Sequence, residues 1–320
     1  MHGGAQAAMI DGAPEEIREL FSKRVKLMAP LLKAWKTALK EEGAADFSGL
    51  IHQAVNILDK GRFISPWKHI LVDEFQDISP QRAELLAALR RQNRQTALFA
   101  VGDDWQAIYR FSGAEMTLTT AFHHYFGEGD RCILDTTYRF NQRIGEVANA
   151  FVQRNPHQLK KTLNSLTKGT KKSLQLLPED QLEALLNKMS GYVQPNERII
   201  VLARYHHLRP EVLDKAATRW PKLKLEFMTI HASKGQQAEY VILLGLSQGD
   251  EGFPAPARES VMEAALLPKV EEFPDAEERR LAYVAITRAI HQVWLLYDRD
   301  EPSDFVAELG RQGVPQVRKP

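Results

Sequence analysis

Short apolar runs that pass into polar loops and then into helical patterns are the feature that most constrains this 320-residue chain. Three such runs occur in its first half, at residues 69–72, 96–101 and 131–134. Four more follow, at residues 198–202, 225–230, 240–246 and 292–297. Because strands that alternate with helices form parallel sheets flanked by helices, the pattern predicts an α/β fold with two such units.

Helical patterns fill the intervals between these runs. Residues 15–40 carry apolar side chains at helical spacing, and Pro30 predicts an interruption within them. Ser79 as an N-cap and Pro80 at the first helical position predict an amphipathic helix over residues 81–91. The beginning of the chain is therefore expected to be mainly helical.

The same patterns predict the domain organisation. We expect a helical segment over residues 1–62, the remainder of a first parallel-sheet domain over 63–137, and a second over 138–320. The second domain is predicted to contain a helix over about 276–289. No internal repeat at a solenoid period divides the chain further.

Composition excludes several classes of protein. Hydrophobic residues make up 44% of the chain and charged residues 26%, which is typical of a globular protein. The single cysteine, Cys132, excludes an internal disulfide and any site with several cysteine ligands. The longest apolar run, residues 241–246, is far shorter than a membrane span, and the N-terminus has no secretory pattern. We therefore expect a cytoplasmic protein without membrane contact.

The net charge of +1 does not by itself favour a nucleic-acid partner. Charge is nevertheless unevenly distributed, because residues 147–178 contain six lysines and arginines and no acidic residue. That stretch is either a solvated basic loop or a surface that faces phosphates, and charge alone leaves both open.

Two carboxylates follow the run at residues 69–72. Asp73 and Glu74 stand at its carboxyl end, which is the edge where parallel-sheet enzymes bind ligands. In a nucleotide hydrolase one such carboxylate holds Mg²⁺ and the other polarises the attacking water. The alternative is an ordinary solvated strand end, and this segment alone leaves both open.

A second polar segment follows the next run. Gly102 permits close approach of the backbone, and the Gln106 amide suits a phosphate oxygen or water. Tyr109 and Phe111 are spaced to present alternate rings, either to a core or to nucleic-acid bases.

Five segments together resemble, in order, motifs of the superfamily 1 DNA helicases of the UvrD/Rep type. They read VDEFQD, VGDDWQAIYRFSGA, LDTTYR, MTIHASKG and EERRLAYVAITRA, and they extend over residues 72–289. The resemblance implies two RecA-like parallel-sheet domains, the first incomplete at its N-terminus. It also implies an ATP-driven motor that uses Mg²⁺ and moves 3′ to 5′ along single-stranded DNA, acting at duplex junctions.

The resemblance assigns roles in the first domain. Asp73 would bind the metal, Glu74 would be the catalytic base, and Gln106 would sense the γ-phosphate and couple it to DNA. Tyr109 and Phe111 would stack on bases, which implies binding with little sequence preference.

It assigns further nucleotide contacts in the second domain. Tyr138 would stack on adenine, while Arg139 and Arg288 would reach the γ-phosphate. Gln237 stands two residues after the motif glycine, Gly235, where the family usually has a glutamate that contacts the ribose. A glutamine can still hydrogen-bond a hydroxyl group but carries no charge, so looser sugar discrimination is expected.

The same resemblance places Thr229, His231 and Gly235 in the motif that touches DNA phosphates and transmits the nucleotide state. Two other features depart from the family. Ser112 stands where an arginine is common, and only residues 205–225 occupy the position of a large accessory insertion. The insertion is therefore expected to be essentially absent.

No Gly-Lys-Ser/Thr phosphate-binding loop occurs in the 320 residues. We therefore expect the chain to be the C-terminal part of a longer helicase, with the N-terminal half of the same protein as its partner and little activity alone. The alternative is a catalytically silent nucleic-acid-binding or adaptor protein that retains the helicase fold. The presence of the whole set of motif residues favours the enzyme.

Overall fold

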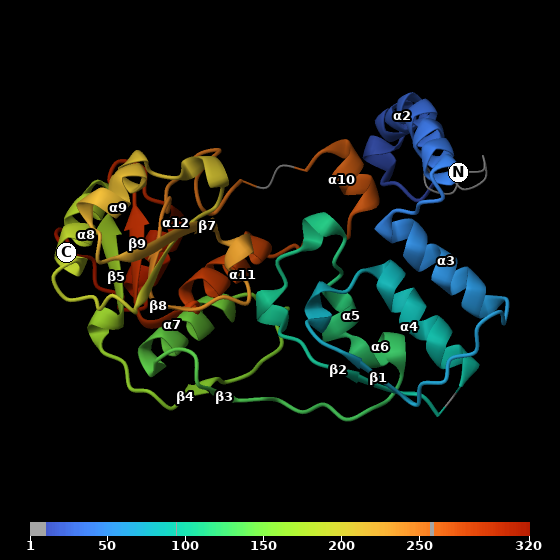
Figure 1. The fold of residues 1–320 in the computed structure, drawn as a ribbon, viewed down its shortest axis with the longest axis horizontal. Coiled ribbons are helices and arrows are strands. Elements are labelled where there is room, and N and C mark those ends of the chain that lie inside the picture. The colour runs from blue at the N-terminus through green and yellow to red at the C-terminus, as the bar shows by residue number, and fades with distance from the viewer. Residues whose placement is uncertain (1–10, 94, 257–258) are drawn as a thin grey trace. The chain divides into compact units, whose positions relative to one another are not determined.

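The computed structural model describes residues 11–93, 95–256 and 259–320, and the chain divides into two compact units (Figure 1). Unit 1 comprises the described residues of Met1–Gly129 and Arg258–Val270. Unit 2 comprises those of Asp130–Ala257 and Glu271–Pro320. Among the helices of the described residues, none has the length and hydropathy needed to cross a membrane.

Unit 1 begins with two helices, α2 (Glu15–Glu41) and α3 (Phe47–Asp59). Helix α2 continues through Pro30, so the predicted interruption is wrong. Proline fits the helical φ angle and removes only one backbone donor, and Pro30 and Lys26 are both exposed, so water can reach the carbonyl of Lys26. The buried Phe21 and Val25 of α2 pack against apolar side chains of α10 (Val261–Leu266).

A two-stranded parallel sheet lies at the centre of unit 1. Strands β1 (His69–Val72) and β2 (Ala97–Ala100) form where two of the apolar runs predict them. Helix α4 (Pro80–Gln92) connects them, and Ser79 caps it by accepting a hydrogen bond from the backbone N–H of Arg82, as predicted. The short helices α5 (Thr117–Thr120) and α6 (Phe122–Phe126) complete a small core over one face of the sheet.

The two faces of this small sheet differ. Val72, Leu98 and Ala100 pack against the core that contains Phe75 and Phe126. Leu71 and Phe99 are paired across the two strands on the other face, where they are 73% and 62% exposed. One face of the unit 1 sheet is therefore apolar and accessible to solvent.

Unit 2 contains a five-stranded parallel sheet in the order β5-β9-β8-β6-β7 (Figure 1). Its strands are β5 (Leu174–Pro178), β6 (Arg198–Ala203), β7 (Lys224–Thr229), β8 (Ala238–Leu243) and β9 (Ala289–Tyr297). The parallel pairing confirms the predicted α/β class. Strands β6 and β8 are almost fully buried, which is why they read in the sequence as continuous apolar runs.

Helices cover this sheet. Helix α8 (Leu182–Met189) contributes to an apolar cluster with the strands. Helices α7 (Gln142–Val152) and α11 (Ala276–Ile286) contact one another and β9, and α11 also contacts β8. Helix α12 (Asp304–Arg311) follows β9 near the end of the chain. The segment between β6 and β7 forms short helical turns and α9 (Ala216–Arg219), and its buried Leu213 and Trp220 join the same apolar cluster as α8.

One predicted strand is wrong. Residues 131–134 form no strand, and Ile133 and Leu134 are exposed. Pairing begins just after them, where β3 (Thr136–Thr137) joins β4 (Asn164–Ser165). An apolar run becomes a strand only where a neighbouring strand accepts its hydrogen bonds.

Candidate functional site

The acidic pair lies at the carboxyl end of β1. Asp73 and Glu74 are exposed and follow the strand directly. Glu74 has φ 48° and ψ 43°, a left-handed conformation that is uncommon for a residue other than glycine. Its backbone N–H donates to Asp73 Oδ1 over 2.8 Å. Such strain requires support from the surrounding structure and is frequent at functional sites.

That support comes from the buried side chain of Gln76. Its Nε2 donates to Glu74 Oε2 over 2.6 Å, and its Oε1 accepts from the backbone N–H of Asp103 over 2.8 Å. The amide therefore joins the carboxyl end of β1 to the loop after β2. Sequence reasoning missed Gln76, although its place within the first acidic motif and its paired donor and acceptor groups were a signal.

Gly102 permits this close approach, as the sequence predicts. A Cβ atom at this position would lie 2.7 Å from Gln76 Oε1 and 3.0 Å from the backbone nitrogen of Gln76. Real Cβ atoms do not approach other atoms as closely as 2.7 Å. A side chain at residue 102 would therefore displace the amide that positions Glu74.

Gln106 extends the hydrogen-bonded chain. Its Nε2 donates to Asp103 Oδ2 over 2.6 Å, and its backbone N–H donates to the Asp103 carbonyl over 2.8 Å. The other carboxylate oxygen of Asp103 accepts from the backbone N–H of Trp105 over 3.1 Å. The structure thus links Glu74 to Gln106 through Gln76 and Asp103, at the edge where the sheet ends.

The two aromatic residues after this loop are in contact with one another. The rings of Tyr109 and Phe111 have centroids 5.9 Å apart and an edge-to-face angle of 63°. Phe111 is 59% exposed, while Tyr109 is half-buried. Burial raises the pKa of the Tyr109 hydroxyl, and the negative charges of Asp77 and Glu74 raise it further. Tyr109 therefore lies within electrostatic range of Glu74 and Asp77, and Phe111 offers its ring to solvent.

Ser112, which the sequence singles out as a departure from the expected motif, has a local role. Its Oγ donates to the carbonyl of Tyr109 over 2.8 Å. The hydroxyl group stabilises the turn that holds the two rings.

The exposed acidic pair has oxygen ligands of the kind that Mg²⁺ prefers. Within residues 11–93, 95–256 and 259–320 no group of three or more histidine, cysteine or carboxylate side chains could hold a metal ion. Mg²⁺ commonly binds through one or two carboxylates, several waters and substrate phosphates. The exposed Asp73 carboxylate fits that donor set.

In unit 2, Arg288 follows α11 and is only 1% exposed. Its Nε donates to the Val284 carbonyl over 2.9 Å, and its Nη1 donates to the Gln236 carbonyl over 3.3 Å. Its own carbonyl accepts from the backbone N–H of Ala238 over 3.0 Å. The guanidinium is thereby fixed against the turn that precedes β8.

That turn carries the other candidates of unit 2. Thr229 ends β7, and its Oγ1 accepts from the backbone N–H of Ala232 over 3.2 Å. His231 begins a short helical turn, and Gly235 has φ +81°, which favours glycine. Gln237 is exposed. The structure thus brings Thr229, His231, Gly235 and Gln237 onto the segment that contacts Arg288.

Tyr138 and Arg139 lie elsewhere in unit 2, between β3 and α7. Tyr138 is 81% exposed, and the backbone N–H of Arg139 donates to Thr137 Oγ1 over 3.2 Å. In the part of the chain that the structure describes, no hydrogen bond joins either side chain to Arg288. Their roles at a nucleotide therefore stay predictions.

Comparison with known proteins agrees with this arrangement of motifs. The model of the UvrD/REP helicase N-terminal domain matches residues 9–127, and that of the UvrD-like helicase C-terminal domain matches residues 179–300. DNA helicase IV of Escherichia coli (strain K12) is 75% identical over 320 residues, which are 100% of this chain and 47% of that protein. A probable DNA helicase of Mycoplasma pneumoniae is 28% identical over 291 residues, or 85% of this chain and 52% of that protein.

The chain thus spans about half the length of these curated relatives. The two matched domain models cover the unit that carries the acidic pair and most of the unit that carries Arg288. From these matches and the ordered motifs, the chain belongs to the UvrD-like helicase family.

Proposed function

We propose that this chain supplies the water-activating, phosphate-sensing and DNA-tracking residues of an ATP-dependent helicase that moves 3′ to 5′ along single-stranded DNA. The observation that carries the proposal is the hydrogen-bonded chain from Glu74 through Gln76 and Asp103 to Gln106. It connects a carboxylate suited to activate water with an amide suited to detect a phosphate. A silent adaptor has no need of this connection.

The chemistry follows from charge. Asp73 would hold Mg²⁺, which neutralises developing charge on the phosphates when it is bound. Glu74, oriented by the Gln76 amide, would accept a proton from the attacking water. Arg139 and Arg288 would stabilise charge on the transferred phosphoryl group, as cationic side chains do in other phosphoryl-transfer sites.

DNA contact would use both units. Phe111 and Tyr109 would stack on bases, a contact worth about 1 to 3 kcal/mol per base and tolerant of sequence. Thr229 and His231 would contact phosphates, since hydroxyl groups and backbone amides suit that role. Binding of this kind weakens steeply with salt.

ATP turnover tests the proposal. We expect none from the 320-residue chain, because its sequence has no Gly-Lys-Ser/Thr loop to hold the phosphates. Joined to a helicase segment that carries such a loop, the chain should hydrolyse ATP and respond to single-stranded DNA. Glu74→Gln should abolish this turnover, whereas Glu128→Gln, a change at an exposed glutamate of the same unit, should not.

Two outcomes would contradict the proposal. Turnover by the joined protein that survives Glu74→Gln would remove the assigned base. A joined protein that binds DNA but never hydrolyses ATP would favour the adaptor instead.

A further inference from the structure

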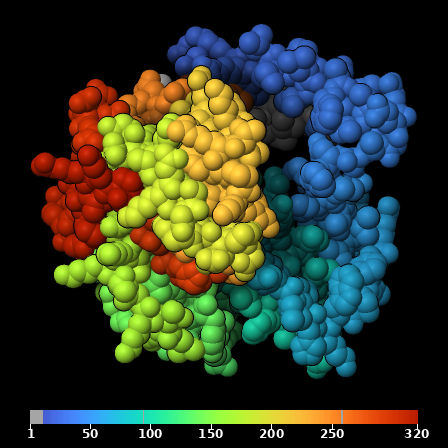
Figure 2. All heavy atoms as spheres, turned by 60° about the vertical axis from the view of Figure 1, so that its left-hand side comes forward, coloured from blue at the N-terminus to red at the C-terminus, as the bar shows by residue number. Residues whose placement is uncertain are grey.

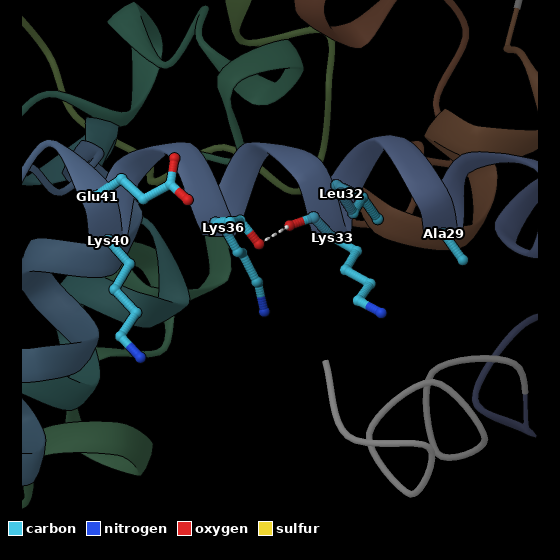
Figure 3. Close-up of a pocket in the computed structure, with 7 residues that line it drawn as sticks. Ala29, Leu32, Lys33, Lys36, Lys40 and Glu41 are labelled. Carbon is cyan, nitrogen blue, oxygen red and sulfur yellow. Dashed lines mark hydrogen bonds between the residues drawn. The ribbon is translucent and has the colours of Figure 1, made fainter.

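Helix α2 presents a row of lysines. From Ser22 to Lys40 the helix contains no acidic residue, and Lys26, Lys33, Lys36 and Lys40 recur at spacings of three, four and seven. Residues at these spacings lie on one face of a helix. Figure 3 shows the side chains of Lys33, Lys36 and Lys40 pointing to the same side of α2, while Glu41 points away. We call these four lysines the lysine row.

The charges of the lysine row are not neutralised by ion pairs. All four side chains are exposed, and no ion pair joins them to a carboxylate within the described residues, whereas Lys23 pairs with Glu19 over 2.7 Å. A hollow of about 840 Å³ lies along α2, and its lining includes Lys33, Lys36 and Lys40 together with one acidic residue, Glu41 (Figure 3). The lysine row therefore presents a concentrated positive charge on an exposed face of α2.

Contacts with other elements of unit 1 hold α2 in place and so fix the direction in which the lysine row faces. Phe21 and Val25 pack against α10, and Trp35 Nε1 donates to Asp46 Oδ2 at the start of α3 over 3.2 Å. Hydrogen bonds from Gly49 and Trp35 lower the pKa of Asp46, and the charge of Lys36 lowers it slightly further. Figure 2 shows the atoms of this part of the chain, in blue, at the surface of the molecule.

We propose that the lysine row binds the phosphate backbone of duplex DNA without reading its sequence. This rests on the proposed function, which makes DNA the partner. Lys26 to Lys40 extends over roughly 21 Å at about 1.5 Å per residue, a length over which one side of a duplex presents phosphates of both strands. Lysine binds phosphate as a point charge and contributes position rather than base recognition.

A duplex suits this face better than a single strand or a membrane. Single strands are bound by aromatic side chains on which bases stack, and the lysine row carries none, since Trp35 contacts Asp46. An interfacial membrane helix inserts its apolar face, whereas part of that face of α2 is packed against α10. The concentration of positive charge along one helix face suits the high charge density of a duplex backbone.

The test replaces three lysines of the row with glutamine: Lys33→Gln, Lys36→Gln and Lys40→Gln together. The matched control removes the same charge from exposed lysines of unit 2, Lys215, Lys222 and Lys224. Fluorescence anisotropy with a labelled blunt duplex gives Kd across a series of salt concentrations. We expect the slope of log K against log salt to become shallower by about 2.7 in the test variant only, with Kd at low salt raised at least about tenfold. Arginine at the same three positions should restore binding.

The outcomes separate this proposal from the proposed function. An unchanged slope and Kd in the glutamine variant, with the parent chain binding duplex, would overturn the lysine row alone. Binding of the parent chain to single-stranded DNA but not to duplex would do the same. A variant that loses binding to anionic phosphatidylserine vesicles while keeping its duplex affinity would show a lipid surface instead. A parent chain that binds neither form of DNA would overturn the proposed function as well. Far-ultraviolet circular dichroism confirms that α2 stays helical in each variant.

Discussion

Replacing Gln76 with glutamate changes one atom of a buried amide and should nevertheless destabilise unit 1 strongly. The new carboxylate would face Glu74 Oε2 across the 2.6 Å that the Nε2 donor now spans. At an effective dielectric constant of about 20, two unit charges about 3 Å apart repel by about 5 kcal/mol. Protonation of the new carboxylate costs less than this repulsion. From a pKa of about 4.3, it costs about 3.7 kcal/mol at pH 7 and about 1 kcal/mol at pH 5.

The expected loss of unfolding free energy is therefore about 3 to 4 kcal/mol at pH 7 and about 1 kcal/mol at pH 5. The protonated carboxyl group can still donate to Glu74, and its other oxygen can still accept from the backbone N–H of Asp103. Urea unfolding at the two pH values measures the difference. Gln95→Glu, at an exposed position of unit 1, is the matched control and should change little.

The variant Gln76→Met distinguishes the effect of the new negative charge from the effect of the lost hydrogen bonds. It leaves the Asp103 N–H without its acceptor, which should lower the unfolding free energy by about 1 to 3 kcal/mol at both pH values. If Gln76→Glu destabilised the protein equally at pH 5 and pH 7, the carboxylate contact would not be the cause and the reasoning would be refuted.

Three further predictions follow from other contacts. Gly102→Ala places a Cβ 2.7 Å from Gln76 Oε1 and should lower the unfolding free energy by about 1 to 3 kcal/mol in urea; a loss under about 0.5 kcal/mol would show that the loop simply moves aside. Phe111→Ala should weaken binding of labelled oligothymidine by about 1 to 3 kcal/mol per stacked base in anisotropy titrations, and an unaltered Kd would exclude stacking there. Burial raises the pKa of Glu179 above its unfolded value, although a hydrogen bond from Gly245 lowers it. This carboxyl group therefore favours folding at pH values below the unfolded pKa. That contribution is lost as the pH rises through the folded pKa. Glu179→Gln should flatten this part of the stability-versus-pH curve in urea titrations at pH values above the ordinary pKa of a glutamate, and an unchanged slope would contradict the assignment.

The strands that could be predicted are those whose apolar residues are contiguous. Strands β6 and β8 are buried on both faces, so their sequences show unbroken apolar runs that end within a few residues of the observed bounds. Strand β5 was not predicted, because its five residues include Gln175 and Pro178 and its partner β9 lies more than a hundred residues away. The run at 131–134 has the composition of a strand but no strand beside it.

The candidate site, too, could be predicted from the sequence only in part. The motif positions identified Glu74 and Gln106, but not Gln76 and Asp103, which connect them. The role of Gln76 depends on the ends of β1 and β2 lying side by side, which involves residues 27 positions apart in the chain. Local sequence patterns do not carry that information. The left-handed conformation of Glu74 was equally invisible, because nothing in its side chain requires it.

The exposed pair Leu71 and Phe99 couples the stability of unit 1 to its surroundings. Complete burial of a leucine or phenylalanine side chain contributes about 1.5 to 3 kcal/mol, so a polypeptide that covers both residues gains a driving force of a few kcal/mol from this pair alone. Such a polypeptide binds the folded sheet and not the unfolded chain, and it therefore raises the midpoint of unfolding by mass action. In the presence of such a polypeptide, the melting temperature of unit 1 would depend on the polypeptide's concentration as well as on the contacts within the unit.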